Sequence, residues 1–295
     1  MSASSTETRD FATRSSDRLR PQVLALVVLG TALGWIWLIV TISGLVATTD
    51  MAALGPGMSV LNAFNSIGGL PASIRAALIL VCTPASAKSW AFGQALQSLA
   101  MWSAMVLAMM LPSATPVLSI ATGRASHALA TAAILALGYL SVWFGFAFVA
   151  AGLESLLVAA RVLQAAMVPM TDVLAATTMM AAGLYQFTPW KAACLRRCRD
   201  PAPAFLAAHA TASETYALGV RLGLDCLGCC WALMAVMFAV GTMNLVWIAA
   251  LAAVMTLEKL MPGRIFGWAI GAGLFVAGAM ILLASPVGAR LIAAL

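Results

Sequence analysis

The sequence predicts an all-α fold, a polytopic bundle of transmembrane helices. Of its 295 residues, 63% are hydrophobic and only 9% are charged. A soluble domain is about a quarter charged, so this chain could not cover its surface in water. In lipid the same composition is expected, because the outside of a membrane protein faces hydrocarbon. The apolar residues also fall into long runs, several of them near the roughly 20 residues that a spanning helix needs.

The first apolar run follows a polar, basic segment rich in Ser and Thr. We expect residues 1–20 to be a disordered cytoplasmic tail and residues 21–290 to form a single transmembrane helical domain. The run after the tail is too long for the core of a signal peptide, and no small-residue cleavage site stands out. The first helix is therefore expected to stay in the protein.

The hydrophobic pattern indicates about seven spans, or six if one of them lies in the membrane interface. Pro112 is expected to end the second. Residues 76–82 form a short apolar piece, 153–168 an amphipathic surface stretch and 204–218 a short helix. The expected spans cover residues 23–48, 90–111, 127–151, 167–189, 222–242, 245–260 and 265–284.

The basic residues predict the orientation, because Lys and Arg accumulate in cytoplasmic connections. With the amino terminus inside, twelve of the 16 lie on the inner side and four outside. We therefore expect a multi-pass protein with its N-terminus in the cytoplasm, located in the inner (cytoplasmic) membrane if the protein is bacterial. The basic residues suit the lipid bilayer as partner. There is no basic groove with interleaved aromatics, so nucleic acid is not expected as a partner.

Five of the six cysteines fall in two groups near the predicted inner face. Cys194 and Cys198 lie in a basic loop, while Cys226, Cys229 and Cys230 open the fifth span. The cytoplasm is reducing, so these thiols indicate metal binding or transient redox chemistry and not a structural disulfide. Cys82, near the other face, is expected to be a packed thiol.

Methionines extend both groups along helix faces. Met234 and Met237 follow Cys226 and Cys230 at helical spacing, and the second span repeats the pattern with Met101, Met105 and Met109. Thiolates and thioethers are soft ligands that select Cu(I), with zinc as a competitor where several thiolates converge. Packing is the alternative, since Met and free Cys are ordinary buried residues. The candidate metal ligands are Cys226, Cys229, Cys230, Cys194, Cys198, Met234, Met105 and Met109.

Neighbouring charges predict how reactive the thiols are. Lys191 and the arginines of the basic loop are expected to lower the pKa of Cys194 and Cys198. The start of the fifth helix is expected to do the same for Cys226 through its free amides. Glu258 and Lys259 are expected to pair with neighbouring charges at the inner face.

The chain lacks the motifs of familiar membrane machines and enzymes. No Walker loop, GxSxG or HExxH motif is present, and no chain of carboxylates or histidines crosses the bilayer. We therefore expect a protein without catalysis of its own and without proton pumping.

Three stretches carry a resemblance to a known family: MWSAMVLAMMLPSATPVL at 101–118, GLYQFTPWKAACLRRCRDP at 183–201, and the segment at 223–263 that contains CLGCCW. They resemble the domain-of-unknown-function 2182 family, described as predicted metal-binding integral membrane proteins, some of them labelled copper chaperones. The resemblance covers about residues 90–284 and implies a membrane fold and a metal role. The residues that it marks are Met105, Met109, Met110, Pro112, Tyr185, Gln186, Lys191, Cys194, Cys198, Arg199, Cys226, Cys229, Cys230, Trp231, Met243, Asn244, Glu258 and Lys259.

Three hypotheses follow. The first is Cu(I) binding and handover to or from a copper donor or acceptor protein, with Cys226, Cys229 and Cys230 holding the ion. In this hypothesis Cys194 and Cys198 complete the site or dock the partner. The second is an accessory or assembly subunit of a larger membrane complex, whose cysteines are structural or hold zinc. The third is a membrane thiol–disulfide oxidoreductase.

Overall fold

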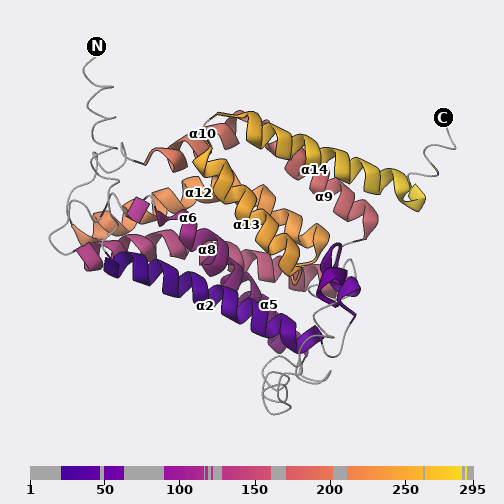
Figure 1. Ribbon diagram of the computed structural model, residues 1–295, viewed down its shortest axis with the longest axis horizontal. Helices are drawn as coiled ribbons and strands as arrows, with labels where there is room; N and C mark the ends of the chain where they lie inside the picture. Colours follow the sequence, from indigo (N-terminus) through magenta and orange to yellow (C-terminus); the bar gives the residue numbers. More distant parts are fainter. Residues whose placement is uncertain are drawn as a thin grey trace.

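The computed structural model describes residues 21–46, 50–62, 90–115, 117–118, 121, 128–160, 171–201, 211–261, 263–287 and 290. The expected tail at 1–20, the apolar piece at 76–82 and Cys82 lie outside these residues. All regular structure within the described ranges is helical (Figure 1). The longer helices are α2 (Pro21–Val46), α5 (Trp90–Met105), α8 (Ala128–Ala159), α9 (Asp172–Tyr185), α10 (Pro189–Arg199), α12 (Ala212–Val240), α13 (Leu245–Leu260) and α14 (Ile265–Ala284).

Five of the described helical segments are long and apolar enough to cross a bilayer, so the chain is a multi-pass membrane protein. They are Pro21–Ser43, Ala95–Ser113, Leu129–Ala159, Ala212–Val240 and Ile265–Ala284. The predicted sixth and seventh spans coincide with α13 and α14. The fourth is shorter than predicted, because α9 has only 14 residues. Helix α13 has 16 residues. Both α9 and α13 are therefore shorter than the roughly 20 residues of a full span.

Pro112 does not end the second span, contrary to expectation. The helix continues through a π-helical turn, η3 (Val106–Met110), into the short α6 (Leu111–Ser113). Proline lacks an N–H group and its ring crowds the preceding turn, and a wider turn relieves both problems. The Ser113 hydroxyl donates to the Met110 carbonyl at 2.7 Å. Such turns often occur at functional sites.

Two other helices are longer than predicted. The described part of the expected surface stretch at 153–168 continues α8 up to Ala159. The expected short helix at 204–218 and the fifth span are one helix from residue 212 onward, α12. Its start is fixed by a capping box, in which Thr211 accepts from the Glu214 amide at 3.4 Å and Glu214 accepts from the Thr211 amide at 3.3 Å. Cys226 is therefore well inside the helix and not at its start.

Small residues let the central helices approach closely. Gly138 of α8 faces Gly219 of α12, and a Cβ atom at Gly138 would lie only 3.1 Å from the Gly219 Cα. Membrane helices use such contacts because packing, and not the hydrophobic effect, holds them together. Helix α14 packs on α9, and α10 packs on α12 near one end of the bundle (Figure 1). The short helices η1 (Met51–Leu54) and η2 (Met58–Leu61) lie at the opposite end.

Candidate metal centre

The segment expected to be a basic loop is the helix α10. The Thr188 hydroxyl caps it by accepting from the Lys191 amide at 3.3 Å, and Pro189 occupies its first turn. Three arginines lie in its last turn, where they complement the helix dipole. Helical geometry then places Cys194 and Cys198 one turn apart on the same face.

The second group of cysteines lies inside α12, on the side that faces the core. Cys226, Cys229 and Cys230 are between 1% and 2% exposed. Because the amides around Cys226 are paired within the helix, the expected influence of a helix start on this thiol does not apply. The helix instead holds the three thiols in fixed positions beneath α10.

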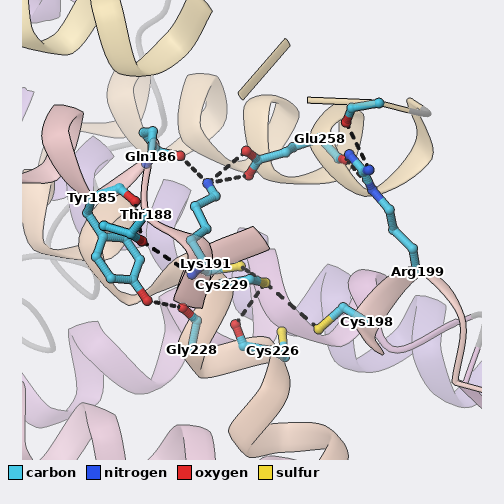
Figure 2. Close-up of polar contacts among 12 residues, drawn as sticks. Tyr185, Gln186, Thr188, Lys191, Cys198, Arg199, Cys226, Gly228, Cys229 and Glu258 are labelled. Atoms are coloured by element: carbon cyan, nitrogen blue, oxygen red, sulfur yellow. Dashed lines mark hydrogen bonds and ion pairs between the residues drawn. The ribbon is translucent and has the colours of Figure 1, made fainter. Parts of the chain in front are cut away.

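Sulfur atoms from α10 and α12 converge. The Sγ atoms of Cys198, Cys226 and Cys229 all lie within 4.8 Å of one another. Cys229 Sγ is 3.8 Å from Cys198 Sγ and 3.2 Å from Cys230 Sγ. Figure 2 shows Cys198 and Cys229 facing each other, with Cys226 beside them. The structure therefore brings Cys198 of the first group together with the second group, whereas Cys194 is not part of this cluster.

The spacing fits a thiolate-bound metal ion. A metal about 2.3 Å from each of three thiolates requires sulfur atoms about 4 Å apart. The separations in the cluster reach that value with little movement of the side chains. Thiolate sulfur is the ligand type that Cu(I) prefers, and Zn(II) also accepts it.

Cys226 is surrounded by polar groups from three other elements. Tyr139 of α8 donates its hydroxyl to Cys226 Sγ at 2.9 Å, and Lys259 of α13 donates to the same sulfur at 3.1 Å. The Ser113 hydroxyl lies 3.1 Å from the Tyr139 hydroxyl and 4.0 Å from the sulfur. These donors favour a negatively charged sulfur, which is the form that binds metals.

Sequence reasoning missed Tyr139 and Ser113. A tyrosine in an apolar helix usually needs a partner for its hydroxyl, and that was the available signal for Tyr139. Lys259 was marked by the resemblance, but a charged partner was expected for it. Its partner in the structure is Cys226.

The arginines of α10 do not act on Cys198 as expected. Its hydrogen bond with Cys226, and then burial, raise the pKa of the Cys198 thiol above its ordinary value. Arg199 is occupied elsewhere, donating to the Glu258 carbonyl at 2.5 and 3.1 Å and to the Gly263 carbonyl at 3.0 Å. The predicted lowering of this pKa is wrong.

Cys194 has a different environment from the other thiols. Arg197 donates to its sulfur at 3.7 Å and also to Asp225 at 2.6 Å. A Cβ atom at Gly228 would lie 2.6 Å from the Cys194 sulfur, so the missing side chain at Gly228 leaves room for Cys194 of α10 to lie against α12. Tyr185 strengthens this contact by donating to the Gly228 carbonyl at 2.5 Å. Cys194, like Cys198, is half-buried, whereas the three thiols of α12 are buried.

A buried ion pair joins α10 to α13. Lys191 and Glu258 are 2% and 3% exposed and lie 2.7 Å apart, and Lys191 also donates to the Gln186 side chain (Figure 2). The expected pairing of Glu258 with a neighbouring charge is confirmed. Since Lys191 is three residues before Cys194, the pair fixes the start of the helix that carries two of the cysteines.

The candidate methionines are buried in the same core as the cysteines. Met105, Met109 and Met234 are at most 2% exposed. Met234 lies one turn beyond Cys230 on α12, which agrees with the shared helix face that the spacing predicted. A role of these thioethers in holding a metal stays a prediction, because burial alone also fits packing.

The fold and this cluster define a multi-pass membrane protein with buried cysteines placed as in a metal-binding site. Comparison with known protein families agrees with that class. The family model of the PpoB2 copper chaperones matches residues 99–281, and the chain belongs to this family. The copper-chaperone description that the resemblance implied is thereby confirmed, whereas membership of the domain-of-unknown-function 2182 family stays a prediction. No curated protein and no solved structure matches the chain significantly.

Proposed function

We propose that the protein binds Cu(I) as cargo at Cys198, Cys226 and Cys229 and hands it to a partner protein at the bundle end that carries α10. The observation that carries this proposal is the convergence of three thiol sulfurs from two helices within 4.8 Å. Cys230 lies at the edge of the group and offers a fourth sulfur 3.2 Å from Cys229. The family's copper-chaperone description supports copper as the cargo.

Charge supports a Cu(I) site as well. Three thiolates around Cu(I) carry a net charge of about −2, which is costly to bury. The Lys259 ammonium, 3.1 Å from Cys226 Sγ, compensates part of that charge. The Tyr139 hydroxyl adds a neutral donor to the same sulfur.

Cys194 is the proposed exit ligand. It is one helical turn from Cys198, it is half-buried, and Arg197 beside it is exposed. A Cu(I) ion that exchanges one buried thiolate for Cys194 moves toward the surface of α10 without any change of oxidation state. The exposed arginines of this helix suit a partner with an acidic docking surface.

Cys194→Ser tests the handover. Purified protein is loaded with one equivalent of Cu(I) without oxygen, and transfer to the chelator bathocuproine disulfonate is followed by absorbance. We expect the transfer rate to fall by about tenfold while the equilibrium affinity stays close to that of wild type. Cys198→Ser is the matched control from the same helix, and it should lower the affinity itself. Equal rates for wild type and Cys194→Ser would remove Cys194 from the transfer route.

A structural zinc site is the second candidate. With Cys230, the cluster offers four thiols, which is the ligand number of structural zinc sites. Metal analysis of protein purified without added metal separates the two functions. One tightly held zinc that Cu(I) does not displace supports the zinc site, whereas copper that exchanges with the chelator supports handover.

A further inference from the structure

A cavity of about 120 Å³ lies beside the ion pair of Lys191 and Glu258 and is separate from the cysteines. Residues of α10, α13 and the start of α14 line it. The volume is well above what a single water molecule needs, so a small polyatomic group fits. The polar side chains that line it are Gln186, Lys191, Arg196, Arg199, Glu258 and Arg264.

The lining is strongly basic. It contains four cationic side chains and one carboxylate, so its net charge is about +3. Glu258 is already paired with Lys191 at 2.7 Å. Arg196 and Arg264 are exposed, and neither pairs with an acidic side chain among the described residues. An anion that enters this cavity therefore meets uncompensated guanidinium groups.

A buried donor without a partner points to the same kind of ligand. Gln186 is 5% exposed, and its Oε1 accepts from Lys191 (Figure 2). Its Nε2 has no hydrogen-bond partner in the described part of the chain. Leaving a buried N–H group unpaired is unfavourable, and an acceptor oxygen in the cavity would satisfy it.

The cavity opens beside a helix that crosses the membrane. Trp268, which also lines it, is on the first turn of α14 and is about half-exposed, and the Arg264 guanidinium lies 5.8 Å from the centre of its ring. Tryptophan and arginine at the end of a spanning helix are typical of the headgroup region of a bilayer. Basic pockets between helices at that level bind lipid phosphates.

We propose that this cavity binds a phosphate group. Arginine forks match phosphate oxygens in charge and geometry, and the unpaired Gln186 donor supplies one more hydrogen bond. The place of the cavity at the membrane edge favours the head of an anionic phospholipid over free phosphate. Bound there, the phosphate bridges α10 and α14 and strengthens the position of the cysteine-bearing helix.

The test measures binding to the full-length protein in detergent. Native mass spectrometry gives the affinities for phosphatidylglycerol and phosphatidylcholine, and titration calorimetry gives the affinity for inorganic phosphate. The variants are Arg264→Gln and Arg196→Gln. Arg221→Gln is the matched control, because Arg221 is an exposed arginine on α12 that does not line the cavity.

We expect phosphatidylglycerol to bind more tightly than phosphatidylcholine, with a loss of about fivefold in each cavity variant and none in the control. A second outcome is that inorganic phosphate binds with the same dependence on Arg264 and that the protein does not prefer either lipid. This result also supports the phosphate site but assigns it to the free anion. The proposal is overturned if neither anion binds, or if Arg221→Gln has the same effect as the cavity variants. Arg196 and Arg264 are both exposed, so these variants are expected to fold.

Discussion

Cys229→Ser is expected to weaken Cu(I) binding strongly. Cys229 is the central sulfur of the cluster, 3.8 Å from Cys198 and 3.2 Å from Cys230. Structural Zn²⁺ sites bind their metal by about 10–16 kcal/mol, and on that scale the loss of one of three or four thiolates weakens binding by roughly 3 kcal/mol or more. This corresponds to a loss of more than about 100-fold in affinity.

The measurement is competition for Cu(I) against bathocuproine disulfonate under anaerobic conditions. Cys194→Ser is the control, because it removes one thiol from the same region and leaves the cluster of Cys198, Cys226 and Cys229 intact. Unchanged affinity in Cys229→Ser would place the copper elsewhere in the protein.

Glu258→Gln is expected to have the largest effect on stability. Lys191 is 2% exposed, and without the carboxylate its ammonium group would be buried and uncompensated. Breaking a buried ion pair by removing one partner costs about 3–5 kcal/mol. The free energy of unfolding in mixed detergent micelles measures the effect.

Two further variants make this test specific. Asp225→Asn removes one partner of the partly exposed Arg197–Asp225 pair and should cost about 1 kcal/mol. The double variant Lys191→Met with Glu258→Gln removes both buried charges and should recover a large part of the loss. If Glu258→Gln lowers the free energy of unfolding no more than Asp225→Asn does, the buried ion pair does not stabilise the fold.

The fold class and two of the helices were predictable because hydrophobic runs define them directly. The limits of α13 and α14 match the predicted spans, since Asn244 and the Pro–Gly pair at 262–263 bound the first run and Arg264 and Ser285 bound the second. The start of α12 was not predicted correctly. Its first turns are polar, and the capping box at Thr211 and Glu214 was not used as a signal. Pro112 misled for a physical reason, because a π-helical turn lets the helix continue past a proline.

The candidate site was predictable only as two separate groups of thiols. Soft ligand chemistry and helical spacing selected Cys226 and Cys230, but the sequence did not reveal how α10 lies across α12. A helix at Cys194 and Cys198 was predictable from Thr188 and Pro189, a common helix start. The approach of Tyr139 to Cys226 depends on the packing of α8 against α12, which no local pattern contains.

X-ray absorption at the copper edge tests the central claim most directly, because it reports the atoms bound to the ion. For protein loaded with one equivalent of Cu(I), the proposed site predicts a shell of three sulfur atoms at about 2.3 Å, as in other thiolate–metal sites, and a changed shell in Cys229→Ser. A shell of nitrogen or oxygen atoms, or a sulfur shell that Cys229→Ser leaves unchanged, would contradict copper binding by the thiols of α10 and α12.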